Sequence, residues 1–101
     1  MRIYIAGKIT NDPNYQRKFA DAERKLLEWK TVDVINPAKI GATLPKLRHE
    51  EYMKISFALI DMADTVLFLD GWEESCGASQ EMGYAIATGK EIWLTKDKMK
   101  F

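Results

Sequence analysis

Four short runs of apolar and β-branched residues divide this chain, and longer segments of helical or irregular character separate each run from the next. The runs are residues 2–6, 31–35, 65–69 and 91–95. Strands that alternate with helices form parallel sheets, because neighbouring parallel strands need a helix-sized crossover between them. The pattern therefore predicts an α/β fold with a four-stranded parallel sheet and right-handed crossovers.

Three of the intervening segments show helical periodicity. Apolar residues recur every three or four positions through residues 15–29, after a capping signal at 11–13. A second helix is expected over about 47–63, following an irregular stretch at 38–46. A third is expected over about 78–88, and Gly89 is placed to end it in the left-handed conformation.

The position of the most apolar run sets the expected strand order. Residues 65–69 are almost uniformly apolar, as in a central strand that helices cover on both faces. The usual doubly wound arrangement then gives the order 2-1-3-4 in a flavodoxin/Rossmann-like three-layer fold. A ligand crevice should open at the carboxyl ends of the first and third strands, where the loops 7–10 and 70–77 meet.

Length and residue usage indicate one domain spanning residues 1–101 in a reducing compartment. The chain has 101 residues, 47% of them hydrophobic, and Cys76 is its one cysteine. No apolar run approaches the roughly 20 residues of a membrane span, and the N-terminus does not resemble an export signal. We therefore expect a cytoplasmic protein that has no membrane contact, and a frayed tail over 96–101.

The charge pattern argues against a nucleic-acid polymer as partner. Fifteen Lys and Arg balance fifteen Asp and Glu, so the net charge is zero. The two halves differ, because residues 1–50 carry ten basic and six acidic side chains and residues 51–101 carry five and nine. This asymmetry suits a small anionic ligand. His49 is the only histidine and has no partner at metal-ligand spacing, so we expect a surface histidine and neither metal nor cofactor.

Several residues at the predicted crevice could contact a ligand. Gly7 permits close approach of backbone amides to a ligand, and Lys8 adds a positive charge. A plain turn is the alternative for this segment. The sequence contains neither a P-loop motif nor a dinucleotide-binding motif. Tyr4 and Trp72 flank the crevice and could stack on a base or sugar. Ordinary strand packing is the alternative for Tyr4.

Ser75 is placed to begin the third helix among small residues. The positive end of the helix dipole and the serine hydroxyl together favour an anion there, and simple N-capping is the alternative.

Glu81 lies near the start of the same helix and could act as a nucleophile or base. The dipole is expected to keep it ionised, while Met82, Ala85 and Ile86 form the buried face. An exposed glutamate is the alternative, and Cys76 is a weaker candidate nucleophile.

Motifs spread over nearly the whole chain resemble the nucleoside 2-deoxyribosyltransferase-like superfamily, and more narrowly its short branch of uncharacterised bacterial and phage proteins. They are Tyr-Ile-Ala-Gly at 4–7, Asn36-Pro37, Asp70-Gly71-Trp72 and, most specifically, the segment 77–90. The resemblance implies a homodimer or higher homo-oligomer that cleaves the N-glycosidic bond of a nucleoside or its 5′-monophosphate. It also implies Glu81 as the catalytic nucleophile, with substrate contacts from Tyr4, Gly7, Lys8, Gly71, Trp72, Ser75 and Gly77.

Two positions depart from the transferases that the chain resembles. Ser56 and Ser75 stand where those enzymes carry aspartate. A serine at position 75 resembles the nucleotide hydrolases of the superfamily, in which this hydroxyl holds the 5′-phosphate, so a nucleoside monophosphate is favoured. Two alternatives are a protein that binds a nucleotide-derived ligand without cleaving it and a purely structural module.

Overall fold

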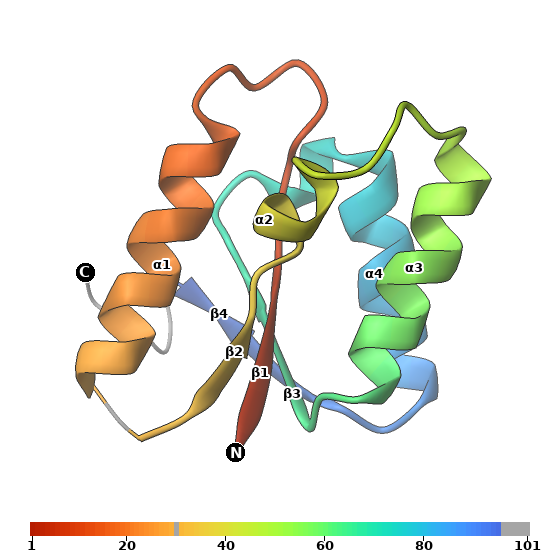
Figure 1. The fold of residues 1–101 in the computed structure, drawn as a ribbon. Helices are drawn as coiled ribbons and strands as arrows, with labels where there is room; N and C mark the ends of the chain where they lie inside the picture. The colour runs from red at the N-terminus through yellow and green to blue at the C-terminus, as the bar shows by residue number, and fades with distance from the viewer. Residues whose placement is uncertain (30, 96–101) are drawn as a thin grey trace.

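The computed structural model describes residues 1–29 and 31–95, and its centre is a parallel four-stranded sheet (Figure 1). The strands are β1 (Arg2–Ala6), β2 (Asp33–Ile35), β3 (Thr65–Phe68) and β4 (Glu91–Leu94). Their order is β2-β1-β3-β4 and every neighbouring pair is parallel. The predicted α/β class and strand order are therefore confirmed. The expected fraying of 96–101 concerns residues outside the described part of the chain.

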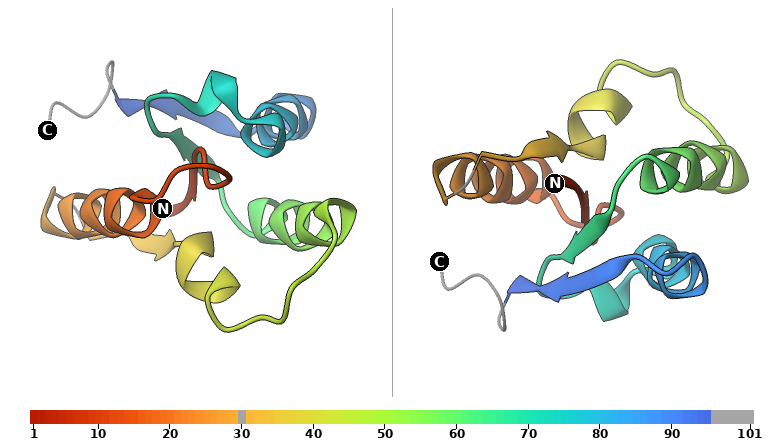
Figure 2. Two further views of the ribbon diagram at one scale, coloured as in Figure 1. Left: turned by 90° about the horizontal axis from the view of Figure 1, so that it is seen from above. Right: turned by 90° about the horizontal axis from the view of Figure 1, so that it is seen from below.

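Helices cover the sheet on both faces, as predicted for a three-layer fold (Figure 2). They are α1 (Tyr15–Trp29), α2 (Pro37–Gly41), α3 (His49–Asp61) and α4 (Cys76–Ala87), with a 3-10 turn, η1 (Trp72–Glu74). The views along the sheet show α1 on one face and the neighbouring helices α3 and α4 on the other. Among the described residues, no helix is long and apolar enough to cross a membrane.

The alternation of side chains along β1 divides the core into two halves. Ile3 and Ile5 are fully buried in a cluster that includes Phe19 and Leu26 of α1. Tyr4, between them, lies in the opposite cluster with residues of α3 and α4. Successive strand residues point to opposite faces, so the spacing of two in Ile-Tyr-Ile directs the Tyr4 ring toward the α3–α4 layer. This direction determines the partner of its hydroxyl group.

The helix starts differ from the sequence-based expectation, and α3 begins at His49, two residues after the expected position. The stretch predicted to be irregular contains α2, because the Asn36 side chain accepts a hydrogen bond from the Ala38 backbone and Pro37 occupies the first turn. Helix α4 begins at Cys76, two residues before the predicted start, because Ser75 caps it. Gly89 has φ +75°, so the predicted left-handed end of this helix is confirmed.

Candidate active site

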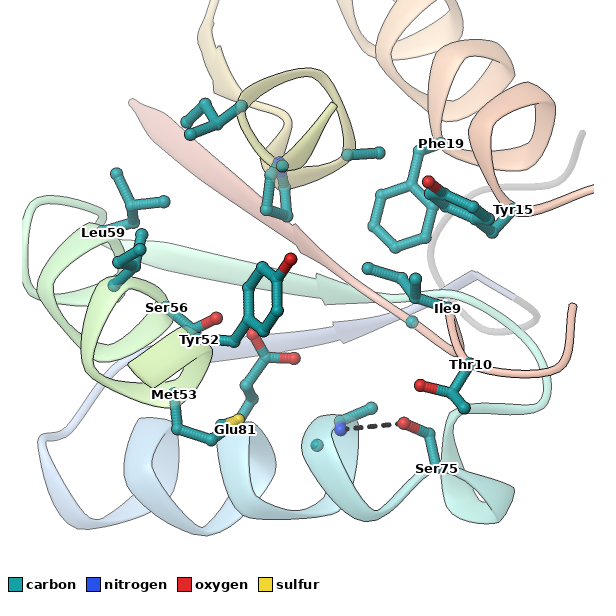
Figure 3. Close-up of a pocket in the computed structure, with 18 of the residues that line it drawn as sticks. Ile9, Thr10, Tyr15, Phe19, Tyr52, Met53, Ser56, Leu59, Ser75 and Glu81 are labelled. Atoms are coloured by element: carbon teal, nitrogen blue, oxygen red, sulfur yellow. Dashed lines mark hydrogen bonds between the residues drawn. The ribbon is translucent and has the colours of Figure 1, made fainter. Parts of the chain in front are cut away.

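A cavity of about 420 Å³ lies at the carboxyl end of β1, at the position where the topology predicts a crevice (Figure 3). Its wall comes from β1 and the turn after it, from the start of α1, from α2 and the segment that follows, and from α3 and the first turns of α4. The cavity therefore extends further toward α2 than the two loops named from the sequence would suggest.

Glu81 lies at the inner end of this cavity and is only 7% exposed. The Tyr4 hydroxyl group donates a hydrogen bond to Glu81 Oε2. The expected buried face of α4 was wrong in part, since Ala85 is buried and Met82 half-buried but Ile86 is 62% exposed. The helix is rotated so that Ala78, Glu81 and Ala85, three and four residues apart, face the sheet.

Burial dominates the electrostatics of the Glu81 carboxyl group. Removal from water raises the pKa of Glu81 to about 7, although hydrogen bonding from the Tyr4 and Ser56 hydroxyl groups partly lowers it. The expectation that the helix dipole keeps this group fully ionised is therefore corrected, because desolvation outweighs the favourable contributions. The pKa of Tyr4 is raised well above its usual value by burial and by the Glu81 charge, so its hydroxyl remains a donor.

The start of α4 borders the same cavity through Ser75 and Gly77. Ser75 Oγ accepts a hydrogen bond of 3.1 Å from the Ala78 backbone, so the hydroxyl does cap the helix. The backbone N–H groups of the first turn, at Cys76 and Gly77, have no partner within a helix by geometry. An anion in the cavity could therefore meet both the Ser75 hydroxyl and the amino end of α4.

Gly7 borders the cavity, yet packing alone accounts for the absence of a side chain there. A Cβ atom at this position would lie 3.2 Å from Leu69 Cβ and 3.3 Å from Phe19 Cζ, closer than ordinary carbon contacts. The glycine thus lets the turn after β1 pass close to Leu69, which follows β3, and to Phe19 of α1.

Three of the predicted contact residues do not line the cavity. Lys8 Nζ lies 3.9 Å from Glu74 Oε1, on the side of η1. Gly71 forms the left-handed turn before η1, with φ +91°. Trp72 packs on Phe68, with ring centroids 5.3 Å apart, as part of the core beneath α4. The structure therefore groups Tyr4, Gly7, Ser75, Gly77 and Glu81 together, and a ligand contact from the other three stays a prediction.

Other cavity residues were not singled out from the sequence as ligand contacts. Tyr52 and Ser56 come from α3, Tyr15 and Phe19 from α1, and Lys46 from the segment between α2 and α3. Tyr52 and Ser56 are four residues apart, so they lie on the same face of α3. This spacing could have indicated from the sequence that the two side chains share one environment.

His49 at the start of α3 is exposed, as expected, but it also borders the cavity, and its Nε2 lies 2.9 Å from Gln80 Oε1. Within residues 1–29 and 31–95, no three His, Cys, Asp or Glu side chains gather closely enough to hold a metal ion.

Comparison with known proteins places this fold in a family. The profile of DUF4406, described as a domain of unknown function, matches residues 1–94. The chain belongs to the DUF4406 family. No match was found among curated proteins.

A solved structure shares the DUF4406 fold seen here. It is titled 2-desoxiribosyltransferase from Leishmania mexicana, and it superimposes with a TM-score of 0.68 at 24% sequence identity. The match covers 92% of this chain and 62% of that one, so the chain spans less than two-thirds of the transferase. A nucleoside 2-deoxyribosyltransferase-like fold, which the sequence motifs implied, is thereby confirmed.

Proposed function

We propose that this DUF4406 protein cleaves or transfers the N-glycosidic bond of a nucleoside 5′-monophosphate or a nucleoside, with Glu81 as nucleophile. The observation that supports it is the buried Glu81 carboxyl group, held by the Tyr4 hydroxyl at the inner end of a cavity large enough for a small ligand. A buried carboxyl group that faces a cavity and has a shifted pKa is a candidate for a reacting group.

The chemistry requires Glu81 in its ionised form. One carboxylate oxygen attacks C1′ of the sugar as the C1′–N bond to the base breaks, through an oxocarbenium-like transition state. The base leaves with the bonding electron pair and takes up a proton, while the sugar remains as an ester on Glu81. Water, or a second base, then attacks C1′ and releases the carboxylate.

Two parts of the cavity wall differ in chemistry, so each suits a different part of the substrate. With the sugar at Glu81, the start of α4 at Ser75 and Gly77 lies on one side and would receive the 5′-phosphate. Apart from Ser75, the Tyr15 ring lies near Ile9 in the cavity wall (Figure 3) and would receive the flat face of the base.

A second candidate function is binding of a nucleotide-derived ligand without cleavage. Among the described residues that line the cavity, Glu81 is the only carboxyl group, and serines occupy positions 56 and 75. A departing base would thus have no second carboxylic acid beside it to supply a proton. This observation favours the binding function, which uses the same cavity.

The two functions are separated by incubation with a panel of nucleosides and nucleoside 5′-monophosphates, followed by chromatography of the free base. The proposal predicts base release by the wild type and by the matched control Glu73→Gln, whose side chain is exposed in η1, and none by Glu81→Gln. Ligand binding measured by calorimetry, with no base released after long incubation, would instead establish the binding function.

We further propose, from the family resemblance, that the active protein is a cytoplasmic homodimer or higher homo-oligomer with a small-molecule ligand and no nucleic-acid polymer. Light scattering of the purified protein measures the assembly, and a monomer that releases base would contradict it.

A further inference from the structure

The Glu81 carboxyl group has hydroxyl neighbours from two different elements of the fold. Tyr4 in β1 donates to Glu81 Oε2. Ser56 in α3 is half-buried, lines the cavity and points its hydroxyl toward the same carboxyl group (Figure 3). The Ser56 hydroxyl group lies near enough to Tyr4 and Glu81 to lower the pKa of each. The three side chains therefore form one connected cluster at the inner end of the cavity.

A buried carboxylate depends strongly on such donors. Its charge has lost most of its contact with water, so each protein hydroxyl that donates to it stabilises the ionised form over the neutral one. A glutamate side chain also has several rotatable bonds, and a single donor leaves the carboxyl plane free to turn about that contact. A second donor from α3, beside the one from β1, would hold the carboxyl group from two separate elements of the fold.

We propose that Ser56 is a positioning residue whose hydroxyl, together with that of Tyr4, holds the ionised Glu81 carboxylate toward the cavity for attack on the substrate. The catalytic consequence rests on the proposed function of Glu81 as nucleophile. The effect of Ser56 on the carboxyl group itself does not depend on turnover and can be measured in the free protein.

Other titratable groups around the cavity leave this interpretation unchanged. Besides Tyr4 of β1, they are Tyr15 of α1, His49 and Tyr52 of α3, and Lys46 before α3. Burial raises the pKa of Glu81, and the Tyr4 and Ser56 hydroxyl groups are the neighbours that lower it. Removing Ser56 therefore deletes one of two donors and leaves the charges nearby as they are.

The direct experiment is a carbon-13 NMR titration of the Glu81 side-chain carboxyl group, with its signal assigned by its loss in Glu81→Gln. Ser56→Thr keeps the hydroxyl, and Ser56→Val has nearly the same shape without it, so the pair isolates the hydrogen bond. Ser56→Ala adds a second deletion, in case the branched side chains disturb α3. Ser79→Ala, on the exposed side of α4, is the control for serine loss in general.

We expect the titration midpoint of Glu81 to rise by about one unit in Ser56→Val and Ser56→Ala and to stay unchanged in Ser56→Thr and Ser79→Ala. For a group with a pKa of about 7 in the wild type, the ionised fraction at pH 7 then falls from about one half to about one tenth. The kcat for base release should fall about fivefold at pH 7 and recover above pH 9, with KM little changed.

Two results would overturn the proposal. An unchanged Glu81 midpoint in both hydroxyl-free variants would show that Ser56 does not act on the carboxylate. A loss of kcat that is equal at every pH and also present in Ser56→Thr would show a merely structural role. If the wild type releases no base, the proposed function fails, yet the titration still decides whether Ser56 holds Glu81.

Discussion

Replacement of Glu81 by glutamine should make the protein more stable at alkaline pH than the wild type. The folded protein holds the pKa of this carboxyl group at about 7, against an ordinary value of 4.5. Below pH 4.5 the group is protonated in both the folded and the unfolded chain, so its burial carries no charge penalty. As the pH rises toward 7, the unfolded chain loses the proton first, and the free energy of unfolding decreases.

The size of the effect follows from the difference between the two pKa values. A shift of one unit corresponds to about 1.4 kcal/mol, so ionisation of buried Glu81 costs about 3 kcal/mol when the pH exceeds 7. Glutamine has no such cost, and its carbonyl oxygen can still accept the hydrogen bond from Tyr4. The stability of Glu81→Gln relative to wild type should therefore increase by about 3 kcal/mol between pH 4 and pH 8.

Urea unfolding at a series of pH values measures this difference directly. Other shifted groups, such as Asp12, Glu23 and Asp64, are present in both proteins and cancel in the comparison. Glu73→Gln, which removes an exposed carboxyl group, should follow the wild type throughout. Parallel pH profiles for wild type and Glu81→Gln would contradict a raised pKa, because the carboxyl group would then ionise as it does in water.

Three further substitutions probe the site and its support. Tyr4→Phe should raise the pKa of Glu81 and lower base release at pH 7 more than at pH 9, and a pH-independent loss would contradict the hydrogen-bond role. Gly7→Ala should destabilise the protein by about 1–3 kcal/mol in urea unfolding, because the added methyl group meets Leu69 and Phe19, whereas Gly83→Ala, in open space on α4, should be neutral or stabilising. Ser75→Ala should cost about 1 kcal/mol of stability and weaken calorimetric binding of nucleoside monophosphates but not of nucleosides, and equal weakening of both would argue against a phosphate contact.

The order of strands and helices could be predicted because its signals are local. The apolar residues in runs such as Ile3-Tyr4-Ile5 and 65–69 indicate buried strands without reference to the rest of the chain. A parallel sheet then allows few connections between these strands. The capping role of Ser75 could also be predicted, because serine is a common residue at the start of a helix.

The rotation of α4 could not be predicted in the same way. Small and apolar residues occur on every side of this helix, so the sequence shows no clear apolar stripe. Ala85 and Ile86 were therefore equally good candidates for its buried face. Which face is buried depends on Tyr4, separated from Glu81 by 77 positions, whose hydroxyl provides the partner for a buried carboxyl group. The packing of Trp72 could not be predicted either, because its contact with Phe68 forms only after η1 turns it back onto the core.

Trapping of the sugar on Glu81 would identify the nucleophile itself. A 2′-deoxy-2′-fluoro nucleoside 5′-monophosphate, in which fluorine slows breakdown of the glycosyl ester, is incubated with the protein, and the intact mass and proteolytic peptides are analysed by mass spectrometry. We expect a mass increase equal to the fluorinated sugar phosphate, located on Glu81 and absent in Glu81→Gln. An unmodified protein that nevertheless binds the nucleotide, or a sugar attached to any other residue, would contradict it.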